Sequence, residues 1–85
     1  MSFKKIISSR NKYGFSFNLL LYGKNIPEDI KERCYENLLE TPQWAYFLRK
    51  GVKDLPEDIK RKAEEKCCED PEWAYYLRIN VKDLP

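Results

Sequence analysis

Apolar residues recur in this chain at the spacing of an amphipathic helix. Ile30, Cys34 and Leu38 lie four residues apart and form one apolar stripe. Pro27 precedes this stripe and is followed by two acidic residues. This order is typical of a first helical turn, because proline lacks an N–H that would have no partner there and the acids complement the helix dipole. Residues 59, 63 and 67 repeat the stripe as Ile, Ala and Cys.

A second helix is predicted after each stripe, beginning at Pro42 and at Pro71. The residue before each proline, Thr41 or Asp70, is a favourable N-cap. Both copies then read Trp-Ala-Tyr-x-Leu-Arg, which places Trp, Ala and Leu on one side of a short helix. These three side chains are therefore predicted to form the packing core.

The whole pattern occurs twice in the chain. Residues 27–55 align without a gap on residues 56–84, and 17 of the 29 positions are identical. Gly51 and Asn80 follow the second helix of each copy, and we expect them to take the left-handed conformation that often ends a helix. The sequence thus predicts an all-α fold, a short α-solenoid of stacked helical hairpins with a 29-residue repeat. We predict a single domain, residues 1–85, divided into a basic, degenerate N-terminal unit (1–26), repeat 1 (27–55) and repeat 2 (56–85).

The opening segment carries only a trace of the repeat. Shifted forward by one repeat length, Phe15 falls on Trp44 and Phe17 falls on Tyr46. Residues 12–26 are therefore predicted to form a helix that packs on repeat 1, because a repeat unit needs a neighbour. A strand is the alternative, since the same stretch alternates large and small residues and is aromatic.

Charge is divided unevenly along the chain, although the net charge is only +2. Residues 1–26 contain five basic and no acidic side chains, whereas residues 27–85 contain 11 basic and 14 acidic ones. A basic segment on a mildly acidic body favours an anionic partner. A solvated terminus is the simpler interpretation of the same pattern.

Histidine is absent, and the three cysteines, Cys34, Cys67 and Cys68, lack paired C-x-x-C spacing. This composition argues against histidine-based catalysis and against a Cys/His zinc site. No glycine-rich phosphate loop is present either. We therefore expect a protein that is not an enzyme and needs no cofactor. An odd cysteine count without a signal peptide or an apolar span of membrane length is expected for a cytoplasmic protein.

Binding of RNA is the function that the remaining side chains favour. Tyr46 with Arg49, and Tyr75 with Arg78, lie three residues apart, so each pair forms a predicted stacking surface for bases. Alternatively, each Tyr packs on the neighbouring repeat and the Arg stem covers it. Phosphate contacts are predicted for a basic stripe, the alternative being an ordinary solvated helix face. Its members are Lys4, Lys5, Arg10, Lys12, Lys24, Lys53, Lys60, Arg61, Lys62, Lys66 and Lys82.

The last repeat has no following unit to cover it. Leu77, Ile79, Val81 and Leu84 supply apolar side chains at this end. A solenoid end needs a polar cap or a partner. We therefore predict a homodimer that uses the C-terminal end.

The segments Pro-Glu-Asp-Ile-Lys, Pro-x-Trp-Ala-Tyr-x-Leu-Arg and Val-Lys-Asp-Leu resemble the short helical repeats of small bacteriophage proteins. In length and basic–aromatic character the chain is similar to the TifA-like family, phage inhibitors of the ToxN endoribonuclease toxin. The resemblance covers residues 27–85 well and 12–26 weakly. It implies an RNA-binding protein that sequesters a host toxin in the host cytoplasm. The alternative is a protein–protein adaptor with no nucleic-acid role.

Overall fold

The computed structural model describes residues 12–82, which form helices joined by short connectors and contain no strand. The all-α prediction is confirmed for the described residues, and the helix predicted within residues 12–26 is present as Lys12–Tyr22. None of the described helices is long and apolar enough to cross a lipid bilayer. The helices are α2 (Lys12–Tyr22), α3 (Glu28–Leu38), α4 (Pro42–Gly51), α5 (Glu57–Cys67) and α6 (Pro71–Asn80).

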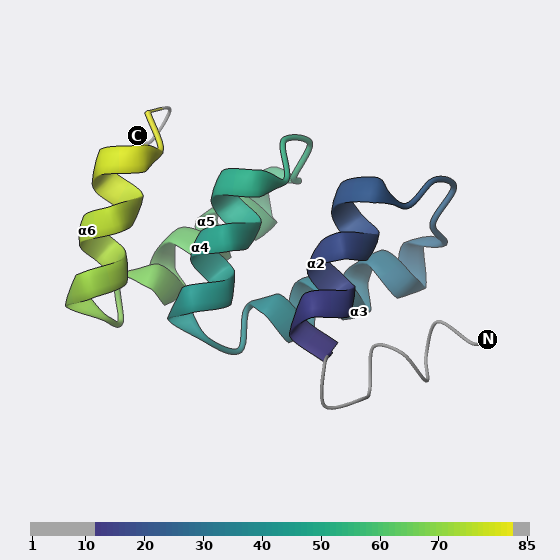
Figure 1. Cartoon of the computed structure of the whole chain (residues 1–85), viewed down its shortest axis with the longest axis horizontal. Coiled ribbons are helices and arrows are strands. Elements are labelled where there is room, and N and C mark those ends of the chain that lie inside the picture. Colours follow the sequence, from purple (N-terminus) through teal and green to yellow (C-terminus); the bar gives the residue numbers. More distant parts are fainter. Residues whose placement is uncertain (1–11, 83–85) are drawn as a thin grey trace.

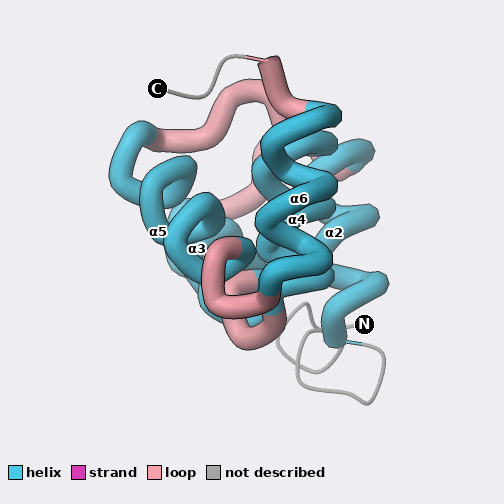
Figure 2. Tube along the Cα trace, turned by 90° about the vertical axis from the view of Figure 1, so that its left-hand side faces the viewer, coloured by secondary structure: helices cyan, strands magenta, loops and turns pink. Residues whose placement is uncertain are grey.

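The helices are arranged in two layers. Helices α2, α4 and α6 lie side by side in one layer, and α3 and α5 form the other (Figures 1 and 2). The bounds of α5 and α6 are those of α3 and α4 shifted by one repeat length. The period found in the sequence is therefore also the offset between the bounds of the helices.

The most extensive packing pairs α4 with α5 and α2 with α3. The sequence-based units instead pair α3 with α4 and α5 with α6, and these pairs pack less extensively. Leu55, in the connector between α4 and α5, is buried with Leu38 and Leu48. The connector is thus part of the core. Packing between successive repeats is therefore more extensive than packing within the units that the sequence defines.

Both predicted N-caps are present. The Thr41 hydroxyl accepts a hydrogen bond from the Trp44 backbone N–H at 3.2 Å. The Asp70 carboxylate accepts one from the Glu72 N–H at 3.0 Å. Each cap satisfies a backbone donor that the helix itself cannot pair.

The predicted left-handed helix ends are wrong. Gly51 and Asn80 are the last residues of α4 and α6, and the extended residues Val52 and Val81 follow them. Among the described residues, only Asn25 has a positive φ. Gly51 instead meets a packing requirement, since a Cβ there would lie 2.9 Å from the ring of Phe17 in α2.

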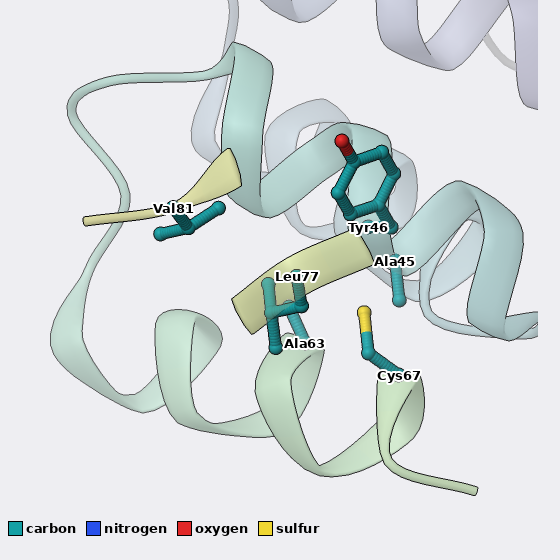
Figure 3. Packing of buried hydrophobic residues seen from close by; sticks show 6 residues of the cluster. All are labelled: Ala45, Tyr46, Ala63, Cys67, Leu77 and Val81. Carbon is teal, nitrogen blue, oxygen red and sulfur yellow. The ribbon is translucent and has the colours of Figure 1, made fainter. Parts of the chain in front are cut away.

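A buried cluster joins α4, α5 and α6. Figure 3 shows its members, which are Ala45, Tyr46, Ala63, Cys67, Leu77 and Val81. The Cys67 thiol donates a hydrogen bond to the Pro42 carbonyl at 3.6 Å. Leu77 and Val81 are therefore covered within the chain and do not offer the exposed dimer surface predicted from the sequence. Of the other predicted dimer residues, Ile79 is exposed and Leu84 lies outside the described residues.

Aromatic contacts repeat along the layer of α2, α4 and α6. The rings of Phe17 and Trp44 lie 6.1 Å apart between α2 and α4. Tyr46 and Trp73, at the equivalent positions of the next step, lie 5.3 Å apart between α4 and α6. These separations are typical of favourable aromatic pairs. The same contact thus joins each helix of the layer to the next.

A polar contact between α4 and α5 departs from the repeat. Arg49 is 7% exposed, and its Nε donates to Glu64 Oε2 at 2.7 Å between α4 and α5. The equivalent positions between α2 and α3 are occupied by Leu20 and Tyr35, which lie in one apolar cluster. The chain therefore fills the same structural position once with an ion pair and once with two members of an apolar cluster.

Replacing the Arg49–Glu64 ion pair by the apolar residues found at the equivalent positions is predicted to preserve stability only when both residues are changed. Glu64→Tyr alone should lower the free energy of unfolding by about 2 kcal/mol, because it removes a charge-assisted hydrogen bond from a buried guanidinium. The double variant Arg49→Leu/Glu64→Tyr recreates the Leu20–Tyr35 pair and should recover at least half of that loss. Urea unfolding followed by circular dichroism measures the difference. Additive effects of the two single substitutions would contradict the prediction.

Candidate nucleic-acid interface

A groove rich in cationic side chains lies between the C-terminal ends of α4 and α6 and the first turn of α5. We call it the C-terminal groove; its volume is about 280 Å³. None of the described residues that line it is acidic. The lining residues are Arg49, Lys50, Val52, Lys53, Lys60, Asn80, Val81 and Lys82.

The backbone at the ends of α4 and α6 explains this geometry. Val52 and Val81 leave the helices in an extended conformation, while their N–H groups still bond to the last turns. Val81 is buried in the core, and Lys82 after it is exposed. Lys53 is likewise exposed after the partly buried Val52. Because successive side chains of an extended segment point to opposite sides, anchoring each valine directs the following lysine outward.

The cations of the groove differ in how far they are neutralised. Arg49 is paired with Glu64, and Lys60 lies 3.5 Å from the Glu57 carboxylate. Lys50 lies over the Tyr46 ring, 5.7 Å from its centroid. Lys53 and Lys82 form no ion pair within residues 12–82. Lys50, Lys53 and Lys82 are therefore the cations best able to bind an anion.

A related groove occurs one repeat earlier, and we call it the N-terminal groove. Its volume is about 610 Å³, and Lys53 lines both grooves. Apart from Lys53, every residue of the C-terminal groove has its counterpart 29 positions earlier in this one. Leu20 and Leu21 replace Arg49 and Lys50, and Asp54 is added. The position of the groove therefore recurs with the repeat, whereas its strong positive charge occurs only in the C-terminal groove.

The opposite charge lines a third groove, between α3 and α5, of about 200 Å³. Glu32, Glu36 and Asp58 lie there with Lys62. These carboxylates disfavour a phosphate beside Lys62. Positive potential is thus concentrated at the ends of α4 and α6.

The structure brings together part of the predicted basic stripe. Lys53, Lys60 and Lys82 meet in the C-terminal groove, together with Arg49 of the predicted stacking pair. Two other predicted lysines are held in ion pairs, Lys12 with Glu40 at 2.9 Å and Lys66 with Glu69 at 3.1 Å. Arg61 and Lys62 are exposed on α5, Lys24 is exposed after α2, and none of these three lines the groove. Lys4, Lys5 and Arg10 fall outside the described residues.

The stacking surface expected from Tyr46 and Arg49 is not present. Tyr46 is buried against the rings of Trp73 and Tyr76, at 5.3 Å and 6.4 Å. Arg49 is buried in its pair with Glu64. A base needs an open ring face, so the packing alternative describes this copy correctly. Tyr75 and Arg78 are exposed on α6, and stacking on that pair stays a prediction.

Lys50 was not among the sequence-predicted site residues, although it lines the C-terminal groove. It differs from its counterparts Leu21 and Ile79, so the repeat alignment gave it no support. Its spacing from Lys53 across a helix end is a signal that could have identified it.

The ionisable groups of the described residues offer little other chemistry. No group of His, Cys, Asp and Glu among them could hold a metal ion. Hydrogen bonds from Lys12 and Tyr13 lower the pKa of Glu40. Burial raises the pKa of Cys67 to about 12 and also raises that of Cys34. Both thiols therefore stay protonated at neutral pH, whereas thiolates are the reactive form.

The chain matches no protein-family model, no curated protein and no solved structure. Its function is therefore inferred from the grooves and surfaces themselves.

Thiol labelling tests the burial of the cysteines. In the native protein we expect a thiol-specific disulfide reagent to modify Cys68 rapidly, because Cys68 is exposed. Cys34 and Cys67 should react only after unfolding in denaturant. The Cys68→Ser variant, which removes the exposed thiol, should show almost no rapid labelling. Rapid release of two or three equivalents from the native protein would contradict the structure.

Proposed function

We propose that this protein binds RNA and that the C-terminal groove contacts the phosphate backbone. One observation carries the proposal: cations from α4, from α5 and from the segments that follow α4 and α6 meet in this groove, and no described acidic residue lines it. Lysines that neutralise phosphates release condensed counterions, which supplies sequence-independent affinity. In this proposal Lys50, Lys53 and Lys82 contact phosphates, while Arg49 and Lys60 add positive charge.

Bases are proposed to stack beside the groove rather than inside it. Tyr75 and Arg78 are exposed on α6, whose C-terminal end forms one wall of the groove. An exposed ring next to a guanidinium accepts bases of any sequence. Single-stranded RNA fits this arrangement, because its unstacked bases are accessible.

The scaffold that we propose for this site is a short α-solenoid whose step is the repeat found in the sequence. Two features support it: the helix bounds recur at this offset, and the Phe17–Trp44 contact recurs as Tyr46–Trp73. A solenoid repeats one groove at every step, which agrees with the counterpart residues of the two grooves.

The resemblance to TifA-like phage proteins extends the proposal to a biological role. The protein would act in the cytoplasm of an infected host and inhibit an RNA-cleaving toxin by sequestering it together with RNA. The RNA-binding part rests on the groove, and the toxin rests on the resemblance alone. Capture of a host endoribonuclease that is lost after ribonuclease treatment would support this role; capture that survives the treatment favours the adaptor.

A protein–protein adaptor without a nucleic-acid role is the second candidate. The observation that favours it is the apolar surface of α6, where Tyr75 and Ile79 are exposed. Such an adaptor would bind its partner with little dependence on salt, because apolar contacts are not screened as phosphate contacts are.

Salt dependence of RNA binding is the direct test of the groove. For single strands, the logarithm of the affinity should fall with the logarithm of the salt concentration by about 0.7 per phosphate contact. Lys53→Gln/Lys82→Gln removes two proposed contacts and should reduce this slope by about 1.4. Fluorescence anisotropy of a labelled single-stranded oligonucleotide at several salt concentrations gives the slope.

The matched control is Arg61→Gln/Lys62→Gln, which removes the same charge from exposed positions outside the groove. This variant should retain most of the wild-type slope. Equal losses in the two double variants would show that overall charge, not the groove, governs binding. An oligonucleotide that does not bind at low salt would exclude RNA binding and favour the adaptor.

A further inference from the structure

Within residues 12–82, the exposed large apolar side chains lie at the two ends of the α2–α4–α6 layer. Helix α2 exposes Phe15 (41%) and Tyr22 (77%). Helix α6 exposes Tyr75 (60%) and Ile79 (50%), with Tyr76 at the margin. The middle helix, α4, exposes no large apolar side chain, because it is covered by a neighbour on each side. Figure 1 shows α2 and α6 at opposite ends of this layer.

Inside the chain, each step of the layer uses the same positions. An aromatic residue of the earlier helix, Phe17 or Tyr46, contacts a tryptophan of the later helix, Trp44 or Trp73. We call this the ring contact. It is made by residues 27 positions apart, so each helix carries both halves, one for each neighbour.

A second contact lies nearer the C-terminal ends of the helices. Leu21 of α2 approaches Gly51 of α4, with Leu21 Cδ2 3.9 Å from where a Cβ of Gly51 would lie. The equivalent residues Lys50 and Asn80 line one groove between α4 and α6. Asn80 also shows that the step accepts a side chain larger than glycine at this position.

The exposed apolar residues of α2 and α6 occupy the positions that make these two contacts elsewhere in the layer, but among the described helices they have no neighbour on that side. By the offset of the repeat, Tyr75 stands at the position of Tyr46 and Phe17, and Ile79 stands at the position of Lys50 and Leu21. Phe15 stands at the position of Trp44 on α2, and Tyr22 stands at that of Gly51. Helix α6 therefore presents one half of the step, and α2 presents the other.

We propose that copies of this chain associate head to tail, with α2 of one copy packed against α6 of another as α6 packs against α4. Tyr75 then pairs with Phe15 of the next copy, and Ile79 pairs with Tyr22. The occupant is a second copy because the chain contains both halves of the contact, each apolar and each exposed at its own end. The interface continues one that already occurs twice within the molecule.

This association differs from the symmetric homodimer predicted from the C-terminal end alone. A head-to-tail contact is heterologous, so it leaves one free surface at each end and extends into longer chains or closes into a ring. Both proposals use Tyr75, so bases can stack on Tyr75 only at the free α6 end of an assembly. Tyr75 does not line the C-terminal groove, so failure of the association and failure of phosphate binding in that groove are separate results.

Two double variants separate the surfaces. Phe15→Glu/Tyr22→Glu blocks the α2 surface, and Tyr75→Glu/Ile79→Glu blocks the α6 surface. All four positions are exposed, so we expect both variants to fold as the wild type does, with circular dichroism as the check. Because both variants introduce Glu, the blocked α2 surface of one variant and the blocked α6 surface of the other also repel each other.

Sedimentation equilibrium measures the masses. The wild type should exceed 10.2 kDa increasingly with concentration, while each variant alone should stay at the monomer mass. An equimolar mixture should form a 1:1 complex of twice that mass and stop there, since each variant retains one complementary surface. Recovery of this complex also shows that both variants are folded.

Three results would overturn the proposal. The first is a wild type that stays monomeric up to about 1 mM, a concentration that detects associations of about 4 kcal/mol. The second is a mixture of the two variants that stays monomeric although the wild type associates. The third is a stable dimer of Phe15→Glu/Tyr22→Glu alone, which would indicate symmetric pairing through α6.

Discussion

The structure depends on one packing contact, an aromatic ring of one helix against the tryptophan of the next helix in the layer. Phe17 on Trp44 and Tyr46 on Trp73 set the separation of α2, α4 and α6. Once these helices lie side by side, their C-terminal ends and connectors meet at one edge of the molecule (Figure 1). The grooves form there because each connector must return the chain to the other layer. A change in the ring contact would therefore alter the core and the candidate site together.

The function that we propose follows from how charge is distributed over this scaffold. The N-terminal groove contains two leucines where the C-terminal groove contains Arg49 and Lys50. The groove between α3 and α5 is lined by three carboxylates. The same groove thus carries five cations and no acid at one step, but two cations and Asp54 at the other, and an acidic surface lies in the other layer. An anionic polymer would be directed to the C-terminal groove by both features.

Much of the fold could be predicted from the sequence, because local signals agreed with one another. Prolines, N-caps and the apolar stripe set the helix bounds, and the offset of the repeat was visible before any contact was known. Gly51 was misassigned because a glycine at a helix end has two uses, a left-handed turn or close packing, and only the position of Phe17 distinguishes them. The burial of Arg49 could not be predicted from the sequence either, because its partner Glu64 lies on a different helix. The charge pattern in the sequence identified several residues of the C-terminal groove. That these residues lie close together could not be predicted, because it depends on how Val52 and Val81 anchor the connectors.

In the function proposed above, RNA binds this protein at the edge where α4 and α6 end. Amide chemical-shift mapping by NMR, with a short single-stranded RNA added to the labelled protein, tests it most directly. We expect the largest shifts at Val52, Lys53, Val81 and Lys82, which line the C-terminal groove. Shifts centred on the acidic groove at Glu32, Glu36 and Asp58, or no shifts at low salt, would contradict it.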